Sequence, residues 1–165
     1  MISYFGLDRG DSDVAAAEHW VRSLVAGVDG VVACTHLVRM PTPHVAVSVA
    51  APLGALAFDH MPEGGALVAR DLHAARSGGR AVVYPGVERL VGRVTVGDVL
   101  AWSAIERISV LGGGAAPDPA VELETRDFVR PQWTDGRLTL MALPAPGGRI
   151  APFELPNPIP CCADH

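Results

Sequence analysis

The chain has 165 residues, a net charge of −5 and a hydrophobic content of 49%, which fits a single folded domain with a substantial core. The acidic balance argues against a nucleic-acid-binding protein, because such proteins normally present a basic face. All 13 basic residues are arginines, and the absence of lysine excludes pyridoxal phosphate (PLP) and other Schiff-base enzymes as well as P-loop nucleotide binding.

The clearest early element is a helix that begins after Asp11 or Ser12 and stops at Gly27. A short strand over residues 2–5 precedes it. The apolar residues of the helix recur at helical spacing and predict one buried face, made of Val14, Ala17, Val21, Leu24, Val25 and Val28. Glu18 falls outside this face.

Three strands are predicted to follow the helix, over residues 31–40, 44–51 and 55–58. Because side chains alternate along a strand, Cys34 and His36 should lie on the same face of the first of them. The second is almost continuously apolar, which is typical of a central strand buried on both faces.

The next segment predicts a short helix near residues 67–75 and strands over 81–84 and 87–94. Thr95 and Asp98 have the spacing of a capping box, in which a hydroxyl precedes an acid by three residues. The sequence therefore predicts that a further helix begins after Thr95.

The clearest hairpin joins residues 121–133 to residues 137–143 through the turn at Asp135-Gly136. Its charged residues predict a cross-strand ladder of ion pairs, formed by Arg126, Arg130 and Arg137 with Glu122, Glu124 and Asp127. Residues 150–155 are predicted to add an edge strand.

These elements predict an α+β fold with a mainly antiparallel sheet and two or three helices. Residues 1–143 are expected to form a single domain. Residues 144–165 are expected to form an extended proline-rich C-terminal tail that packs on the body of the domain.

Cysteine and histidine recur at two places with metal-ligand spacing, in Cys34-x-His36 and Cys162-x-x-His165. The two patterns together resemble the ligand set of a Rieske iron–sulfur cluster. A mononuclear zinc site fits the same residues with fewer demands, because zinc prefers thiolate and imidazole ligands. We therefore predict a small metal-binding protein, with zinc favoured over an iron–sulfur cluster or copper, whose ligands come from Cys34, His36, Cys161, Cys162 and His165. The alternative is a buried, inert Cys34 and an exposed tail.

A second hypothesis is a metal-free enzyme or a small-molecule-binding accessory protein. Its pocket would lie near His44 and His60, and Asp59 would tune a histidine that acts as a general base. His73, which lies beside Asp71, is predicted to be a surface residue. A third hypothesis is an oligomeric structural or interaction module. The sequence leaves open whether the protein is an enzyme.

The high apolar content predicts a homo-oligomer, at least a dimer. The first residues lack the charged and apolar regions of a signal peptide, and the longest apolar run, residues 45–58, is shorter than the roughly 18 residues of a membrane helix. We therefore expect a cytoplasmic protein that does not associate with membranes. The abundance of Ala, Gly, Val, Arg and Pro is typical of a GC-rich bacterial genome.

Overall fold

The computed structural model describes residues 1–156, and within that range it contains three α-helices and ten strands. The helices are α1 (Val14–Leu24), α2 (Gly65–Ala74) and α3 (Val96–Trp102). The strands are β1 (Ile2–Asp11), β2 (Val32–Val38), β3 (His44–Pro52), β4 (Arg80–Val83), β5 (Arg93–Thr95), β6 (Arg107–Val110), β7 (Glu122–Glu124), β8 (Gln132–Thr134), β9 (Arg137–Ala145) and β10 (Arg149–Pro152). Two short 3₁₀ helices are η1 (Val87–Arg89) and η2 (Pro146–Gly148).

The strands form one continuous sheet in the order β1-β3-β2-β4-β8-β9-β10-β7-β5, and β6 pairs with β9. Most neighbouring strands are antiparallel, whereas β6–β9 and β7–β10 are parallel. The predicted α+β fold with a mainly antiparallel sheet is therefore confirmed. The last nine residues of the predicted tail, 157–165, lie outside the described range, so its packing on the body stays a prediction.

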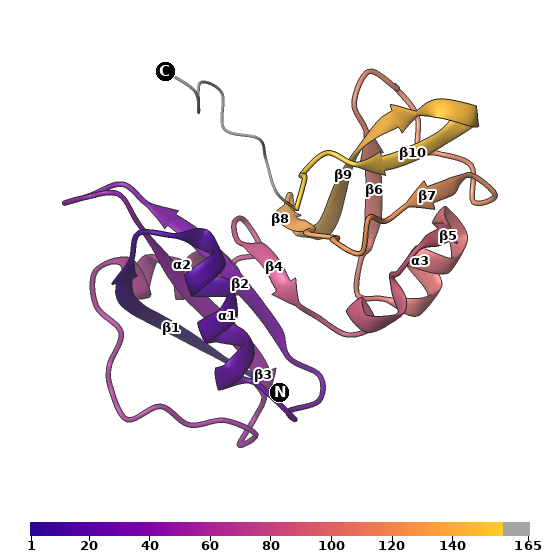
Figure 1. Cartoon of the computed structure of the whole chain (residues 1–165). Coiled ribbons are helices and arrows are strands. Elements are labelled where there is room, and N and C mark those ends of the chain that lie inside the picture. The colour runs from indigo at the N-terminus through magenta and orange to yellow at the C-terminus, as the bar shows by residue number, and fades with distance from the viewer. Residues whose placement is uncertain (157–165) are drawn as a thin grey trace.

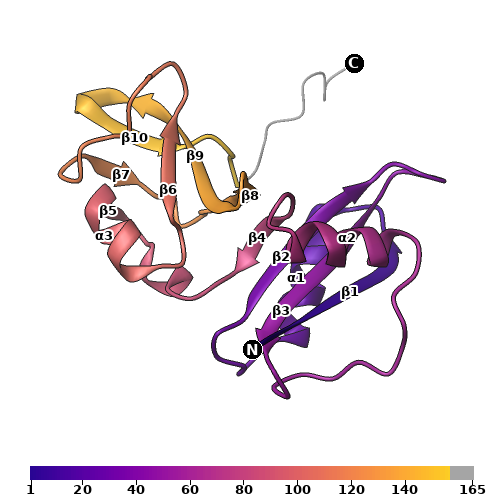
Figure 2. The same ribbon diagram turned by 180° about the vertical axis from the view of Figure 1, so that it is seen from behind.

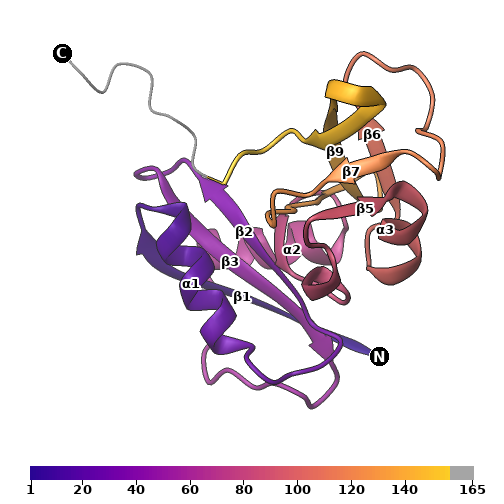
Figure 3. The ribbon, with the colours of Figure 1, turned by 45° about the vertical axis from the view of Figure 1, so that its right-hand side comes forward.

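The N-terminal lobe is a three-stranded sheet with a helix on each face (Figures 1 and 3). On the face of α1, Val47 and Val49 of β3 pack with Ala17 and Val21 of the helix. On the opposite face, α2 approaches β1 closely because Gly6 has no side chain, and a Cβ at that position would overlap the backbone of α2. The central strand β3 is buried from residue 45 to residue 51, as its apolar run predicts.

The C-terminal lobe contains β5 to β10 and α3, and it has a hydrophobic core of its own (Figure 2). The largest buried side chains of this core are Tyr84, Leu90, Ile105, Leu123, Leu138 and Leu140. Strands β4 and β8 join the two lobes, with Arg80 opposite Gln132 in the register. The N–H of Trp133 donates to the carbonyl of Gly79 at 3.0 Å, which extends this junction beyond β4.

The hairpin predicted over residues 121–133 is shorter than expected. Arg126 and Asp127 both have positive φ angles, of 55° and 52°, which interrupt an extended run. The run therefore divides into β7 and β8. Only β8 forms a hairpin with β9, through the predicted turn at Asp135 and Gly136.

Three other predicted strands differ from the structure. Residues 55–58 belong to the loop between β3 and α2, and residues 87–94 divide into η1 and β5. The strand predicted at an edge over residues 150–155 is β10, which lies between β9 and β7. As a result, residues 144–145 and 149–152 at the start of the predicted tail contribute to the sheet.

The predicted cap of α3 is confirmed. Thr95 caps α3, and its hydroxyl accepts a hydrogen bond from the N–H of Asp98 at 3.1 Å. In residues 1–156, none of the helices combines the length and the apolar character that crossing a bilayer requires.

Candidate functional site

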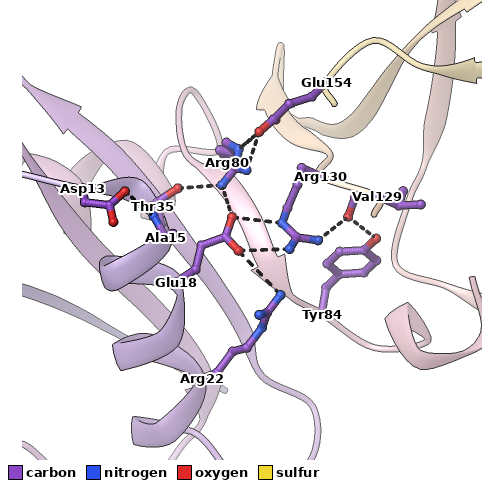
Figure 4. Close-up of polar contacts among 10 residues, drawn as sticks. All are labelled: Asp13, Ala15, Glu18, Arg22, Thr35, Arg80, Tyr84, Val129, Arg130 and Glu154. Carbon is purple, nitrogen blue, oxygen red and sulfur yellow. Dashed lines mark hydrogen bonds and ion pairs between the residues drawn. The ribbon is translucent and has the colours of Figure 1, made fainter. Parts of the chain in front are cut away.

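A buried carboxylate on α1 joins the two lobes (Figure 4). Arg130 donates two hydrogen bonds to Glu18, from Nε to Oε1 at 3.1 Å and from Nη2 to Oε2 at 3.0 Å. Arg80 donates to the same carboxylate at 2.6 Å and to the hydroxyl of Thr35 at 3.3 Å. The Nε of Arg80 also donates to both carboxylate oxygens of Glu154, at 2.8 Å each.

The charges in this cluster stabilise the ionised form of Glu18. Burial alone would raise the pKa of Glu18, but the hydrogen bonds and charges of Arg130 and Arg80 outweigh that effect and hold the pKa below its usual value. The guanidinium of Arg130 also lies over the ring of Phe128, at 4.0 Å from its centroid. The cluster is therefore an ionic contact at every pH above the acidic range.

Two sequence predictions about these residues are wrong. Glu18 is only 7% exposed, although helical spacing places it outside the buried face of α1. Arg130 pairs with Glu18, 112 residues away, and takes no part in a ladder along the predicted hairpin. The cross-strand pairs that form are Arg93 with Glu124 and Arg149 with Glu122.

On the opposite face of the N-terminal sheet, a hydrogen-bonded chain links two histidines through a serine. His36 Nε2 lies 2.7 Å from Ser48 Oγ, which lies 2.8 Å from His73 Nδ1. Strands β2 and β3 supply the first two residues and α2 supplies the third. All three side chains are buried, and Ser48 and His73 are almost completely inaccessible.

The prediction that His73 is a surface residue is therefore wrong. The helix α2 buries Ala66, Ala69 and His73, which recur at the three- and four-residue spacing of one helical face. This spacing was the signal in the sequence, but two small residues and a histidine form a weak apolar pattern. The burial of His73 became evident only from the packing of α2 on β1 and β3.

The imidazoles of His36 and His73 are both neutral at pH 7. Burial lowers the pKa of His36 to about 4. Burial also lowers the pKa of His73 to about 3, with smaller contributions from the nearby His36 and Arg76. In each case the low-dielectric surroundings disfavour the protonated ring.

The hydrogen bonds favour one arrangement of protons. His73 Nε2 is buried and has no hydrogen-bond partner among residues 1–156, so a proton on Nδ1 avoids leaving a buried donor unpaired. His73 Nδ1–H then donates to the Ser48 hydroxyl, and the Ser48 hydroxyl donates to Nε2 of His36. This arrangement places the remaining proton of His36 on Nδ1.

Cys34 and His36 lie on the same face of β2, as the alternation of a strand predicts. A Cβ at Gly79 would lie 2.9 Å from Cε1 of His36 and 3.1 Å from Cβ of Cys34. Burial raises the pKa of the Cys34 thiol, and the neighbouring Ser48 and Trp133 oppose this effect only in part. Within the part of the chain that the structure describes, the indole nitrogen of Trp133 makes no hydrogen bond of normal geometry. Cys34 is therefore a protonated, inaccessible thiol.

The metal prediction involves residues on both sides of the described boundary. Residues 1–156 hold no group of three or more His, Cys, Asp or Glu side chains that is arranged to bind a metal ion. Cys161, Cys162 and His165 lie outside the described residues. The metal site that would combine them with Cys34 and His36 stays a prediction.

A cavity of about 450 Å³ opens beside β2, next to Arg80, where β4 begins. One wall is apolar and comes from both helices and from β2, with Val14, Leu37 and Leu72. The polar groups of the cavity are Thr35, His36, Arg80, Gln132 and Glu154. Thr35 and His36 face opposite sides of the sheet, so a cavity at the strand edge reaches both the ionic cluster and the histidine chain.

The residues of the second predicted site, His44, Asp59 and His60, lie away from the cavity beside His36. His44 Nε2 lies 2.6 Å from a carboxylate oxygen of Asp8, and the Thr42 carbonyl and this carboxylate raise the pKa of His44. Asp59 and His60 are exposed in the loop between β3 and α2. Neither His44 nor His60 lines the cavity beside His36.

Comparison with known proteins found no family model, no curated protein and no solved structure that matches the chain. The function therefore has to be argued from the geometry of the cavity and its neighbours.

The buried histidines predict that the protein loses stability as the pH falls. An unfolded histidine has a pKa near 6.5, whereas His36 and His73 have folded values of about 4 and about 3. Below pH 6.5 the unfolded chain takes up protons that the folded protein does not. The free energy of unfolding should therefore fall by about 2 kcal/mol for each histidine between pH 7 and pH 5, as measured by urea unfolding.

A double variant, His36→Gln with His73→Gln, should lose most of this pH dependence. The control variant His44→Gln removes a histidine whose pKa is raised, so it should keep the fall or steepen it. An unchanged dependence in the double variant would contradict the assignment.

The ionic cluster predicts that replacing Glu18 strongly lowers the stability of the protein. Replacing Glu18 with alanine leaves Arg130 buried without its partner, which should lower the free energy of unfolding by about 3–5 kcal/mol. Replacing Glu122, whose pair with Arg149 is half exposed, should cost less than about 1 kcal/mol. Chemical unfolding at pH 7 measures both. Equal losses in the two variants would show that Glu18 does not hold the lobes together.

Proposed function

We propose that the protein binds a small, uncharged organic molecule in the cavity beside His36. The observation that supports the proposal is the imidazole of His36, which is neutral, mostly buried and borders the cavity. Its hydrogen bond to Ser48, which in turn contacts His73, fixes the orientation of the ring. A fixed polar group in an otherwise apolar pocket is the usual composition of a small-molecule site. The cavity volume of about 450 Å³ falls within the range of such sites.

The charges around the cavity favour a ligand without net charge. Arg80 is the cationic group in the lining, and its guanidinium is already bound by Glu18 and Glu154. His36 is neutral at pH 7. A charged ligand would have to lose its hydration without gaining a free partner, which is costly.

The polar groups indicate the chemistry of that ligand. Because Nε2 of His36 is bonded to Ser48, Nδ1–H is the ring donor left for a ligand. The amide of Gln132 offers a second polar contact, and Leu37 and Leu72 supply apolar surface. These features suit a molecule with an apolar body and a hydrogen-bond acceptor such as a carbonyl or ether oxygen.

The same geometry favours binding over covalent catalysis. Ser48 is fully buried behind His36, so its hydroxyl does not reach the cavity. The Cys34 thiol is also fully buried, and its raised pKa removes the reactive thiolate. We therefore assign His36 a role in orienting a ligand.

The proposal predicts that His36→Gln weakens ligand binding about 3- to 10-fold, because one hydrogen bond is lost. A glutamine amide at this position can still reach Ser48, so the hydrogen-bonded contact with Ser48 behind the site is retained. The probes are neutral aryl amides and ketones of fragment size. The measurement is a titration followed by the methyl NMR signals of Val14, Leu37 and Leu72, which line the cavity.

The matched control is His44→Gln, a histidine at the start of β3 that lies outside the cavity lining and should leave the affinity unchanged. The proposal fails if no probe shifts these methyl signals at millimolar concentration. It also fails if His36→Gln and His44→Gln bind equally well.

A second candidate function is metal binding, which the common face of Cys34 and His36 favours. His36 borders the cavity, and Glu154, two residues before the end of the described chain, lines the same cavity. A ligand set that combines His36 with Cys161 or Cys162 and His165 would suit zinc. A metal on Cys34 would have to displace the proton that burial retains on its thiol.

This candidate predicts near-stoichiometric zinc in protein purified without a histidine tag, and a lower zinc content in a Cys162→Ser variant. Elemental analysis of both proteins tests it, and Glu122→Ala serves as a surface control. Absence of metal from both proteins after zinc has been supplied would rule out the terminal site.

A further inference from the structure

The histidine chain behind the cavity can hold its protons in two ways. In the forward arrangement, His73 Nδ1–H donates to Ser48 and the Ser48 hydroxyl donates to Nε2 of His36, which leaves the proton of His36 on Nδ1. In the reversed arrangement, His36 Nε2–H donates to Ser48 and the Ser48 hydroxyl donates to Nδ1 of His73. The same pairs of atoms are joined in both cases, so the heavy atoms need not move.

The two arrangements present different groups to a ligand. His36 lines the cavity, and its Nδ1 is the ring nitrogen that does not contact Ser48. In the forward arrangement this nitrogen is a donor, whereas in the reversed arrangement it is an acceptor. A ligand acceptor therefore fits the forward arrangement, and a ligand donor requires the reversed one.

The reversed arrangement carries a cost at the far end of the chain. It places the proton of His73 on Nε2, which is buried and has no hydrogen-bond partner among residues 1–156. The imidazole of His73 is 1% exposed and lies against the rings of Tyr4 and Trp133, whose centroids are 5.5 Å and 6.1 Å away. A buried N–H in such surroundings loses its hydrogen bonds to water and gains none.

Two polar groups beside His73 are themselves donors. The indole of Trp133 can only donate, and within residues 1–156 its buried nitrogen also makes no hydrogen bond. The guanidinium of Arg76 lies over the Trp133 ring, 5.1 Å from its centroid, and its charge helps to lower the pKa of His73. Donors and a positive charge favour a bare nitrogen at Nε2 of His73 over an N–H, and they therefore stabilise the forward arrangement.

We propose that His73, which does not line the cavity, makes the cavity select hydrogen-bond acceptors over donors. It does so through Ser48: because an N–H at Nε2 of His73 is disfavoured, Nδ1 of His36 keeps its proton. His73 is thus a positioning residue that acts on a ligand only through His36. The selectivity rests on the proposed binding role of the cavity, whereas the proton arrangement exists without a ligand.

Nitrogen NMR of the ligand-free protein tests the proton arrangement. At pH 7, where both rings are neutral, protonated and bare ring nitrogens give well-separated signals, and His36→Gln and His73→Met assign them. We expect His36 and His73 both to carry the proton on Nδ1. A neutral histidine free in water carries its proton mainly on Nε2, so this result would be specific to the chain. A proton on Nε2 of either ring would overturn the proposal.

A matched pair of fragments tests the selectivity. Indanone and indole are neutral bicyclic molecules of similar size, and the first offers a carbonyl acceptor whereas the second offers an N–H donor. The wild-type protein should bind indanone at least about fivefold more tightly than indole, because indole requires the unpaired N–H on His73. Titrations followed by the methyl signals of Leu37 and Leu72 give both affinities.

Two substitutions of similar size separate the role of His73 from its packing. In His73→Met, the thioether sulfur can accept from Ser48 and carries no hydrogen, so the reversed arrangement leaves no donor unpaired. In His73→Leu, the reversed arrangement leaves the Ser48 hydroxyl unpaired. The preference for indanone should therefore fall at least about threefold in His73→Met and stay within about twofold of wild type in His73→Leu.

Equal preferences in the Met and Leu variants would overturn the proposal, and so would a wild-type protein that prefers indole. If neither fragment binds to any of the three proteins, the proposed function fails and the selectivity fails with it. In that case Nδ1–H on both rings would still show that His73 determines which nitrogen of His36 is protonated.

Discussion

The contact between Glu18 and two arginines sets the arrangement of the two lobes. A carboxylate that is 7% exposed is tolerated only when cations satisfy it, and removing one partner from such a pair is far more costly than removing the whole pair. Arg80 comes from the first residue of β4, and Arg130 comes from the segment before β8. The C-terminal hydrophobic core also includes Cys34 of β2 and Ala81 of β4, so this charge cluster and the short β4–β8 junction add to an apolar contact between the lobes.

The cavity beside His36 follows from this junction. Because β4 begins at Arg80, opposite Thr35, no strand of residues 1–156 continues along this side of β2 beyond Thr35. The arginine that satisfies Glu18 also forms part of the cavity wall. The ionic cluster lies on the α1 side of the sheet and the histidine chain lies on the α2 side. The cavity is therefore bounded by one rigid polar assembly from each face. This arrangement neutralises its charges and fixes its one histidine before any ligand binds.

Patterns confined to neighbouring residues predicted the elements but not the contacts between them. The buried strand β3, the Thr95 cap and the turn at Asp135 each depend on a few consecutive residues, and each is confirmed. The positive φ angle at Arg126 left no such signal, because arginine does not mark a break in a strand, and Asp127 without a following glycine is a weak turn signal. The pairing of Glu18 was equally hidden, since its partners lie 62 and 112 residues away.

The two residues that the sequence patterns misplaced, Glu18 and His73, lie behind the cavity and support it through Arg80 and through Ser48. Glu18 and His73 each occupy a buried position on a helix whose other buried residues are small or β-branched, so an apolar pattern assigned them to the surface. A polar side chain in such a position destabilises the fold unless a partner is supplied from elsewhere. Here the partners are two arginines in one case and Ser48 in the other. Because both groups lie next to a cavity, their burial is compatible with the binding role that we propose for it.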